Sequence, residues 1–365
     1  MRRLRSLCLY LLCVTVLLAG SGFLATGTAA AAVPNRWGFA YVNIPSGIPD
    51  PSHQAGSWPA GFNVTVSPGV PGETFVRFPQ IAGPGGVVHV TAVIDAAVWC
   101  QAGKWWPSGP DEIVSVKCYK FGGSPAAVPF SIVYNESTGL LPAPQGFGYV
   151  HYMPGSIVTQ FNSAGGINTV VPIAVNAWRV VLPGLGTPGP EGGVQVTAAD
   201  PQQPARCKVR AWPAAPVVAG AQTVEVVCHD ALNGPLKTGW SLTYQRRRAI
   251  YGAAIPPKLF AYTFDNVPAN PGPYAPVPAG INFNSVGAVN TVQTAGTGLR
   301  LVTFPKVGTL PDNVQVTAYG PGPEYCNLLT VWTTSASMAY VRDVACYTAV
   351  TRLDTASLVT YASFW

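Results

Sequence analysis

Charge is scarce in this chain. Charged residues make up 10% of its 365 residues, against roughly 25% in an average globular protein. The formal net charge of +6 falls to +3 (6 − 3) once Arg2, Arg3 and Arg5 leave with the N-terminal segment described below. So small a net positive charge does not indicate nucleic-acid binding. We therefore expect no nucleic-acid partner.

Motifs of catalysis are also lacking. A serine-hydrolase elbow needs G-x-S-x-G, but Phe161 and Phe283 stand where Ser163 and Ser285 would need the first glycine. There is no phosphate loop, EF-hand loop or zinc helix. Glycosidases need two facing carboxylates; any two of the 15 acidic residues could meet in space, but nothing local marks a pair. The sequence predicts no enzyme and no cofactor.

Long apolar runs are missing except at the N-terminus. Three arginines precede the run Leu7 to Leu18, and small residues at Ala29 to Ala32 offer a cleavage site, which is typical of a secretory signal peptide. We assign residues 1–32 to this signal. The alternative is an uncleaved membrane anchor, because Leu7 to Ala32 carries no charge. With the signal removed, we expect a secreted, extracellular protein that is not in a membrane.

The cysteines suit that compartment. Of eight cysteines, Cys8 and Cys13 lie in the signal, and six remain. An even number of cysteines in an exported protein favours disulfides. Metal binding is the alternative, but it usually needs close pairs such as C-x2-C, and the chain has none, while its four histidines are scattered. We therefore predict no metal site.

What the chain does contain is a unit written three times. Each copy has a Val-x-Val-Thr-Ala string followed by a cysteine, a tryptophan and a second cysteine. Six cysteines allow 15 connectivities, and the repeat selects one of them, with a single bridge inside each copy. The strings begin at Val88, Val194 and Val314, and the predicted bridges are Cys100–Cys118, Cys207–Cys228 and Cys326–Cys346.

The spacing predicts whole domains rather than short repeats. Equivalent cysteines lie 107 and 119 residues apart (207 − 100 and 326 − 207), and a period near 110 residues is that of tandem domains. We place these domains at 33–136, 143–246 and 257–365, with linkers at 135–145 and 245–258. In the second linker, Arg246-Arg247-Arg248 is predicted to be a solvated run, or alternatively a processing site or surface tether.

Each copy predicts about seven short strands. Period-two alternation and turn residues at 8–12-residue spacing favour a sandwich or barrel. The fold prediction is all-β, with three tandem antiparallel β-sandwich domains, Ig-like or jelly-roll-like, of about 105 residues each. Within this pattern, we expect residues 44–59 to form a loop. We also expect Phe62 to share a strand face with Val64 and Val66, and Lys208 to face outward.

The order of these motifs resembles a known group of proteins. It is similar to the tandem modules of secreted, uncharacterised repeat proteins of high-GC Gram-positive bacteria, and the stretch from Thr297 to Pro305 carries the resemblance best. The first two copies depart from it at the Thr-Gly step. The resemblance implies an exported all-β protein and brings no catalytic residues.

Tryptophans are the one feature that could bind a ligand. Trp212 and Trp332 recur 5 and 6 residues after the first cysteine of their copies, and a repeated position favours a core tryptophan packed on the disulfide. Trp58 and one of Trp105 and Trp106 have no counterparts, so they are the weak ligand-binding candidates. We predict a secreted, non-enzymatic structural or interaction protein with a protein or cell-envelope glycan as partner. The alternative is a carbohydrate-binding module array.

Overall fold

The described part of the chain folds as strands joined by turns and by two short 3-10 helices. The computed structural model describes residues 35–252 and 259–365, and no α-helix occurs within them. The predicted signal at 1–32 lies outside the described residues. The all-β prediction is confirmed. The division into three domains and their sandwich type stay predictions. No helix in the described residues is long and apolar enough to cross a membrane.

The first third of the chain contains strands β1 to β8. Their bounds are β1 (Arg36–Val42), η1 (Pro51–His53), β2 (Gln54–Gly56), β3 (Thr65–Pro68), β4 (Glu73–Phe78), β5 (Val87–Ala92), β6 (Val98–Ser108), β7 (Asp111–Lys120) and β8 (Phe130–Glu136).

The middle third contains strands β9 to β16. Their bounds are β9 (Gly146–Met153), β10 (Ser156–Asn162), β11 (Thr169–Ala174), β12 (Ala177–Pro183), β13 (Gly193–Ala198), β14 (Ala205–Ala211), β15 (Ala221–Asp230) and β16 (Trp240–Arg246).

The last third contains strands β17 to β26. Their bounds are β17 (Phe260–Asp265), η2 (Ala279–Ile281), β18 (Asn282–Asn284), β19 (Thr291–Gly296), β20 (Leu299–Phe304), β21 (Asp312–Ala318), β22 (Tyr325–Leu328), β23 (Thr333–Ser335), β24 (Met338–Thr348), β25 (Thr351–Arg352) and β26 (Ser357–Ser363).

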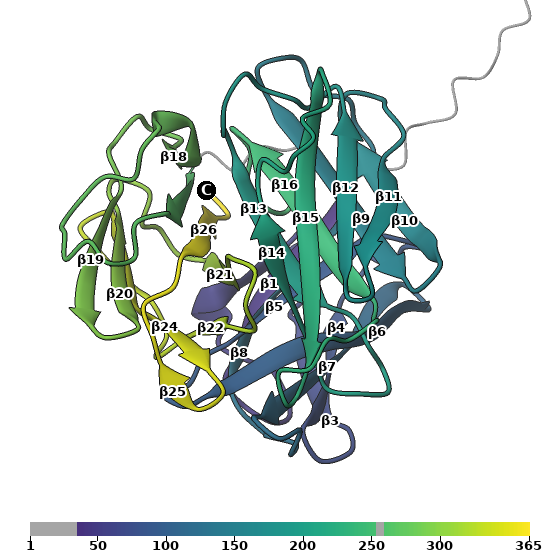
Figure 1. Cartoon of the computed structure of the whole chain (residues 1–365). Coiled ribbons are helices and arrows are strands. Elements are labelled where there is room, and N and C mark those ends of the chain that lie inside the picture. Colours follow the sequence, from purple (N-terminus) through teal and green to yellow (C-terminus); the bar gives the residue numbers. More distant parts are fainter. Residues whose placement is uncertain (1–34, 253–258) are drawn as a thin grey trace, which may run out of the picture. The chain divides into compact units, whose positions relative to one another are not determined.

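Each third forms two antiparallel sheets, and the strand order is the same in all three. We name them sheet I and sheet II of each third (Figure 1). Sheet I is β2-β1-β8-β5, β10-β9-β16-β13 and β18-β17-β26-β21 in the three thirds. Sheet II is β3-β4-β7-β6, β11-β12-β15-β14 and β19-β20-β24-β22, and β23 and β25 also pair with β24. Topology therefore repeats with the sequence.

The two sheets of a third share one apolar core. In the first third, Val90 and Ile132 of sheet I belong to the same buried cluster as Val76 and Val114 of sheet II. Successive side chains of a strand point to opposite faces, so each sheet places alternate residues in this cluster. The middle and last thirds have corresponding clusters around Val224 and around Val341.

Two local expectations about the first third are wrong. The stretch 44–59, expected to be a loop, contains η1 and strand β2, which pairs with β1 through Gly38↔Gly56 and Ala40↔Gln54. Phe62 is 47% exposed, whereas Val64 and Val66 are buried. The reason is that strand β3 begins only at Thr65, so the residues before it do not follow strand alternation.

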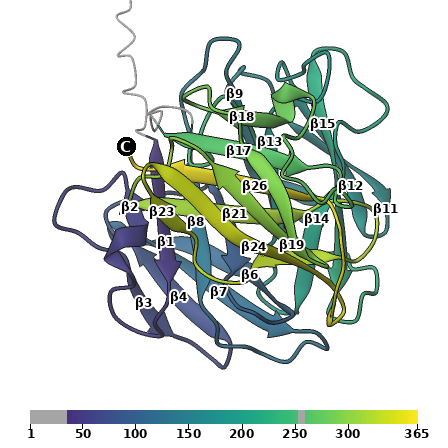
Figure 2. The same ribbon diagram turned by 90° about the vertical axis from the view of Figure 1, so that its left-hand side faces the viewer.

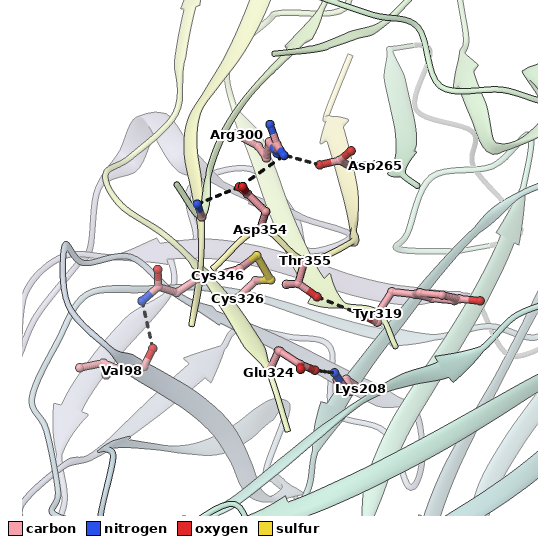
Figure 3. Close-up of a disulfide and its surroundings, with 12 residues drawn as sticks. Val98, Lys208, Asp265, Arg300, Tyr319, Glu324, Cys326, Cys346, Asp354 and Thr355 are labelled. Carbon is pink, nitrogen blue, oxygen red and sulfur yellow. Dashed lines mark hydrogen bonds and ion pairs between the residues drawn. A yellow bond between two sulfur atoms is a disulfide. The ribbon is translucent and has the colours of Figure 1, made fainter. Parts of the chain in front are cut away.

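The three predicted disulfides are confirmed. Cys100–Cys118, Cys207–Cys228 and Cys326–Cys346 are bonded. Each bond joins directly opposite residues of two neighbouring strands in sheet II. Figure 3 shows the third of these bridges. The chain separations of 18, 21 and 20 residues correspond to about 3 kcal/mol of stabilisation each in the chain-entropy model.

Contacts between the thirds are cyclic: the first third bonds to the middle, the middle to the last, and the last to the first. They centre on the Val-x-Val-Thr-Ala strands β5, β13 and β21, whose labels lie near the middle of Figure 1. A threonine of each strand accepts a hydrogen bond from a valine amide of the preceding third. Thr197 accepts from Val90 at 3.3 Å, and Thr317 accepts from Val196 at 3.0 Å. Thr91 closes the cycle by accepting from Val316 at 3.0 Å. We call this set the threonine ring.

The variable residue of the motif extends the ring. Thr317 donates to Gln195 Oε1 at 2.7 Å, and Thr91 donates to Gln315 Oε1 at 2.9 Å. In the first third the same place is taken by His89, whose Nδ1 lies 3.2 Å from Thr197 Oγ1. The valines of the motif thus pack in the core of their own third, and its polar residues form hydrogen bonds with a neighbouring third.

Residues beside the first cysteines follow the same cyclic rule, and they overturn the prediction that Lys208 faces outward. Lys208 is 3% exposed, and its Nζ lies 2.5 Å from Glu324 of the last third (Figure 3). Gln101 bonds backbone atoms of the middle third, and Asn327 bonds those of the first. Alternation along β14 therefore places the lysine in an interface and not in solvent.

The three arginines of the second linker are not a solvated run. Arg246 and Arg248 are each 7% exposed, and only Arg247 is exposed. Arg247 Nε lies 3.3 Å from Glu191 Oε1. The prediction is wrong because strand β16 continues through Arg246, so sheet packing covers that side chain.

Candidate functional site

Two of the three candidate tryptophans line one cleft. The cleft has a volume of about 260 Å³. Trp105 and Trp106 come from β6, His151 and Met153 from β9, and Thr159 from β10. The remaining lining residues are Gly83, Pro84, Gly85, Gly103, Lys104, Pro107, Val158 and Pro201. Residues of the first and middle thirds therefore form this cleft together.

A β-bulge positions the tryptophan pair. The register of β6 against β7 shifts between Ala102 and Trp105. The Trp105 indole N–H donates to Gly85 O at 3.1 Å, and its ring centre lies 4.3 Å from that of His151. Trp105 also packs on the core of the first third. It is therefore held on several sides.

Trp106 is held less firmly. It is half-buried, and the Lys104 ammonium lies 4.9 Å from its ring centre. Phe75 approaches it edge-on, with ring centres 6.2 Å apart. Lys104 is exposed, so a ligand that displaced its flexible side chain would reach one face of Trp106. Aromatic faces bind the apolar faces of ring-shaped ligands and attract cations.

His151 provides a neutral polar wall. Burial lowers the pKa of His151 to about 4, against the opposing effect of a hydrogen bond with the backbone of Trp240. The imidazole is thus uncharged at neutral pH. Its buried Nδ1 has no hydrogen-bond partner within the described residues. The cleft can therefore offer a ligand an indole face, a neutral imidazole and a lysine ammonium.

Two carboxyl groups meet behind the wall of this cleft, at Gly83. Glu112 accepts a hydrogen bond from the Gly83 amide at 3.0 Å, and Glu136 pairs with Arg36 at 2.7 Å. Burial, and secondarily the charge of Glu136, raise the pKa of Glu112 to about 8, so this carboxyl is protonated at neutral pH. Glu112 is fully buried and does not line the cleft, so a ligand in the cleft does not reach this carboxyl.

Trp58 lies elsewhere and performs a packing role. It packs against the core of the first third, above Gly38 and Gly56. A methyl group on Gly56 would come within 1.9 Å of its ring, and one on Gly38 within 2.5 Å. Those glycines make room for the indole. Trp58 remains half-buried, but it does not belong to the cleft.

The repeated tryptophans are core residues, as expected from their position. Trp212 is 3% exposed and Trp332 is 1% exposed, and each belongs to the buried cluster of its own third. The Trp332 indole N–H donates to Asp312 Oδ1 at 2.7 Å. Within residues 35–252 and 259–365, no cluster of three or more His, Cys, Asp or Glu residues could hold a metal ion.

Sequence reasoning missed Lys104 and His151. Neither residue belongs to a motif, and His151 reaches the cleft only because β9 of the middle third packs beside β6 of the first. The pair Trp105-Trp106 has one tryptophan more than the repeat requires, and this was the only sequence feature that pointed to the cleft. No family model matches the chain, and neither a curated protein nor a solved structure matches it.

Proposed function

We propose that this chain is an exported, non-enzymatic structural or interaction protein built from three disulfide-bonded β-sandwich modules. The threonine ring is the observation that carries the proposal. It joins the thirds through equivalent residues, so that the last third bonds to the first as the first bonds to the middle. A closed set of contacts in which all three ring threonines accept hydrogen bonds favours a rigid body that presents surfaces to a partner.

Each module in this proposal covers one third of the chain and two sheets. The supporting observation is that sheet I and sheet II of a third enclose one buried cluster and that each sheet II carries one disulfide. Disulfides persist in oxidising, extracellular surroundings. The partner would be a protein or a glycan of the cell envelope.

Export is tested by expressing the full chain in a Gram-positive secretion host. We expect the protein in the medium with a mature N-terminus near Val33, because the small residues before it suit a signal peptidase. Mass spectrometry of non-reduced peptides should find the three bridges within their thirds. Retention of an intact N-terminus in the membrane fraction, or free thiols, would contradict the proposal. Turnover in a broad hydrolase screen would contradict its non-enzymatic part.

The cleft at Trp105 and Trp106 supports a second candidate function, the binding of envelope carbohydrate. We expect a glycan array to show binding by the full chain and a loss of about 2- to 13-fold in affinity for Trp106→Ala, because this variant removes an aromatic contact worth about 0.5–1.5 kcal/mol. Trp58→Ala is the matched control, since it removes another half-buried tryptophan that lies outside the cleft. Equal loss in both variants, or no binding by the parent protein, rejects this candidate.

A further inference from the structure

In sheet I, the middle third differs from the other two in the connection between the first two strands. The segment between the first and second strands of sheet I covers residues 43–53 in the first third and residues 266–281 in the last. In the middle third only Pro154 and Gly155 separate β9 from β10. A long segment that is present in the first and last thirds is therefore missing from the middle third.

In the first and last thirds the long segment adds backbone pairing to the edge of sheet II. Gly47 and Val66 exchange two hydrogen bonds, of 2.9 and 2.8 Å. Tyr274 and Val292 do the same, also at 2.9 and 2.8 Å. Val66 of β3 and Val292 of β19 occupy equivalent places, because they pair with Val76 and Val302 of the next strand. In each case the segment forms an isolated antiparallel bridge at this point and is rich in proline.

These segments also place apolar side chains on the core. Ile44 packs against the cluster of the first third, and Tyr274 packs against that of the last. Each segment therefore acts as a short extra strand whose side chains cover one side of the sandwich.

The middle third leaves that place open. The residue equivalent to Val66 is Val170 of β11, which pairs with Val180. By the same register, the amide and carbonyl of Val170 point away from β12, and no backbone bridge reaches them within the described chain. Strands β10 and β11 lie at the right-hand edge of Figure 1.

A cleft of about 490 Å³ lies along this edge. Its lining includes Tyr152 and Trp178, together with Ile157, Val170, Pro172 and Lys237. Val175 of this lining is 68% exposed, and Val171, between the lining residues Val170 and Pro172, is 50% exposed. Clustered exposed apolar side chains of this kind mark interaction surfaces.

We propose that this edge binds an extended, proline-containing apolar segment of a partner polypeptide, which would pair with Val170 as the Gly47 segment pairs with Val66. The inference rests on the proposed function as an interaction protein and names the partner class. Addition of a strand to a sheet edge supplies main-chain hydrogen bonds, and aromatic-lined grooves suit proline-rich chains. Pro172 lacks an amide, but Pro68 stands at the same place in β3, where Gly47 still pairs with Val66.

The segments that cover this edge in the first and last thirds provide peptide probes for the test. Fluorescently labelled peptides with the sequences of residues 43–50 and 271–278 are titrated with the full chain, and binding is followed by anisotropy. We expect saturable binding by at least one of them. We expect Val170→Pro to raise the dissociation constant at least tenfold, because proline removes the outward-pointing amide at a position where an edge strand tolerates it. Thermal unfolding of the variant confirms that it is folded.

A second variant keeps the test decisive. Replacing Pro154 and Gly155 by residues 43–53 gives the middle third a covering segment of its own, and it should abolish peptide binding while the protein stays folded. Absence of saturable binding to the parent protein up to about 1 mM, or binding by both variants as tight as that of the parent, overturns the proposal. Self-association that Val170→Pro removes would also overturn it, because the occupant would then be a second copy. None of these results alters the export or glycan experiments, so failure here and failure of the proposed function are distinguishable.

Discussion

Replacement of Thr317 by valine is expected to lower the free energy of unfolding by about 2–6 kcal/mol, since each of two buried polar groups left without a partner costs about 1–3 kcal/mol. The two groups are the Val196 amide, which donates to the Thr317 hydroxyl, and Gln195 Oε1, which shares the single hydroxyl proton with Val196 O at 3.1 Å. Valine has nearly the same shape as threonine, so the packing of the strand is retained. Urea denaturation at pH 7, followed by tryptophan fluorescence, measures the change.

Thr317→Ser is the matched control for this experiment. Serine keeps the hydroxyl and loses one methyl group, so we expect it to retain most of the stability that valine loses. Thr333→Val removes a hydroxyl from an exposed position of β23, and surface changes of this kind alter stability by no more than about 0.5 kcal/mol. If Thr317→Val matched Thr333→Val, the threonine ring would not hold the thirds together.

The sequence predicted the elements whose partners are close in the chain. The cysteine pairs and the strands that carry them lie about 20 residues apart, with turn residues between them. Within such a stretch, period-two alternation specifies which face of a strand is apolar. The repeat then selected one disulfide pattern, because the same two cysteines recur in each copy.

Closure of the ring could not be predicted in the same way. A repeated motif has identical residues in each copy, so the pattern cannot distinguish a partner in its own copy from one in the next. Strand alternation therefore assigns the threonine of Val-x-Val-Thr-Ala to the polar face of an ordinary strand. The structure buries this threonine in all three copies. Lys208 was misplaced for the same reason, since its partner Glu324 lies 116 residues further along the chain.

The candidate cleft was predicted only in part. The unmatched tryptophans pointed to the surface around Trp105 and Trp106, and the structure places both of them in the cleft. Trp58 was an equally reasonable candidate, because nothing in the sequence shows that Gly38 and Gly56 lie beneath its ring. Which surface aromatic is open to a ligand depends on such long-range neighbours.

Replacement of His89 by glutamine is expected to make the protein more resistant to acid. Burial alone lowers the pKa of His89 to about 3, whereas an unfolded histidine has a pKa near 6.5. Between pH 6.5 and pH 3, His89 is therefore protonated in the unfolded chain and neutral in the folded chain. Stability is lost as the pH falls through this window, by about 3 kcal/mol at pH 4 relative to pH 7 for this residue.

Glutamine is the natural replacement because it already stands at the equivalent positions 195 and 315, where it accepts a hydrogen bond from a ring threonine. His89→Gln should thus keep that bond to Thr197 while removing the titrating group. Unfolding free energies measured at pH 7 and pH 4 should differ by about 3 kcal/mol less in the variant than in the parent. Burial also lowers the pKa of His151 and of His229 to about 4, so some acid sensitivity should remain. An unchanged pH dependence in His89→Gln would mean that His89 gains its proton without disrupting the ring. The histidine at the variable position of the motif would then be neutral to stability. The hydroxyl of Thr197, and that of Thr243, whose Oγ1 lies 2.7 Å from His89 Nε2, would have to accept hydrogen bonds from an imidazolium in the folded protein.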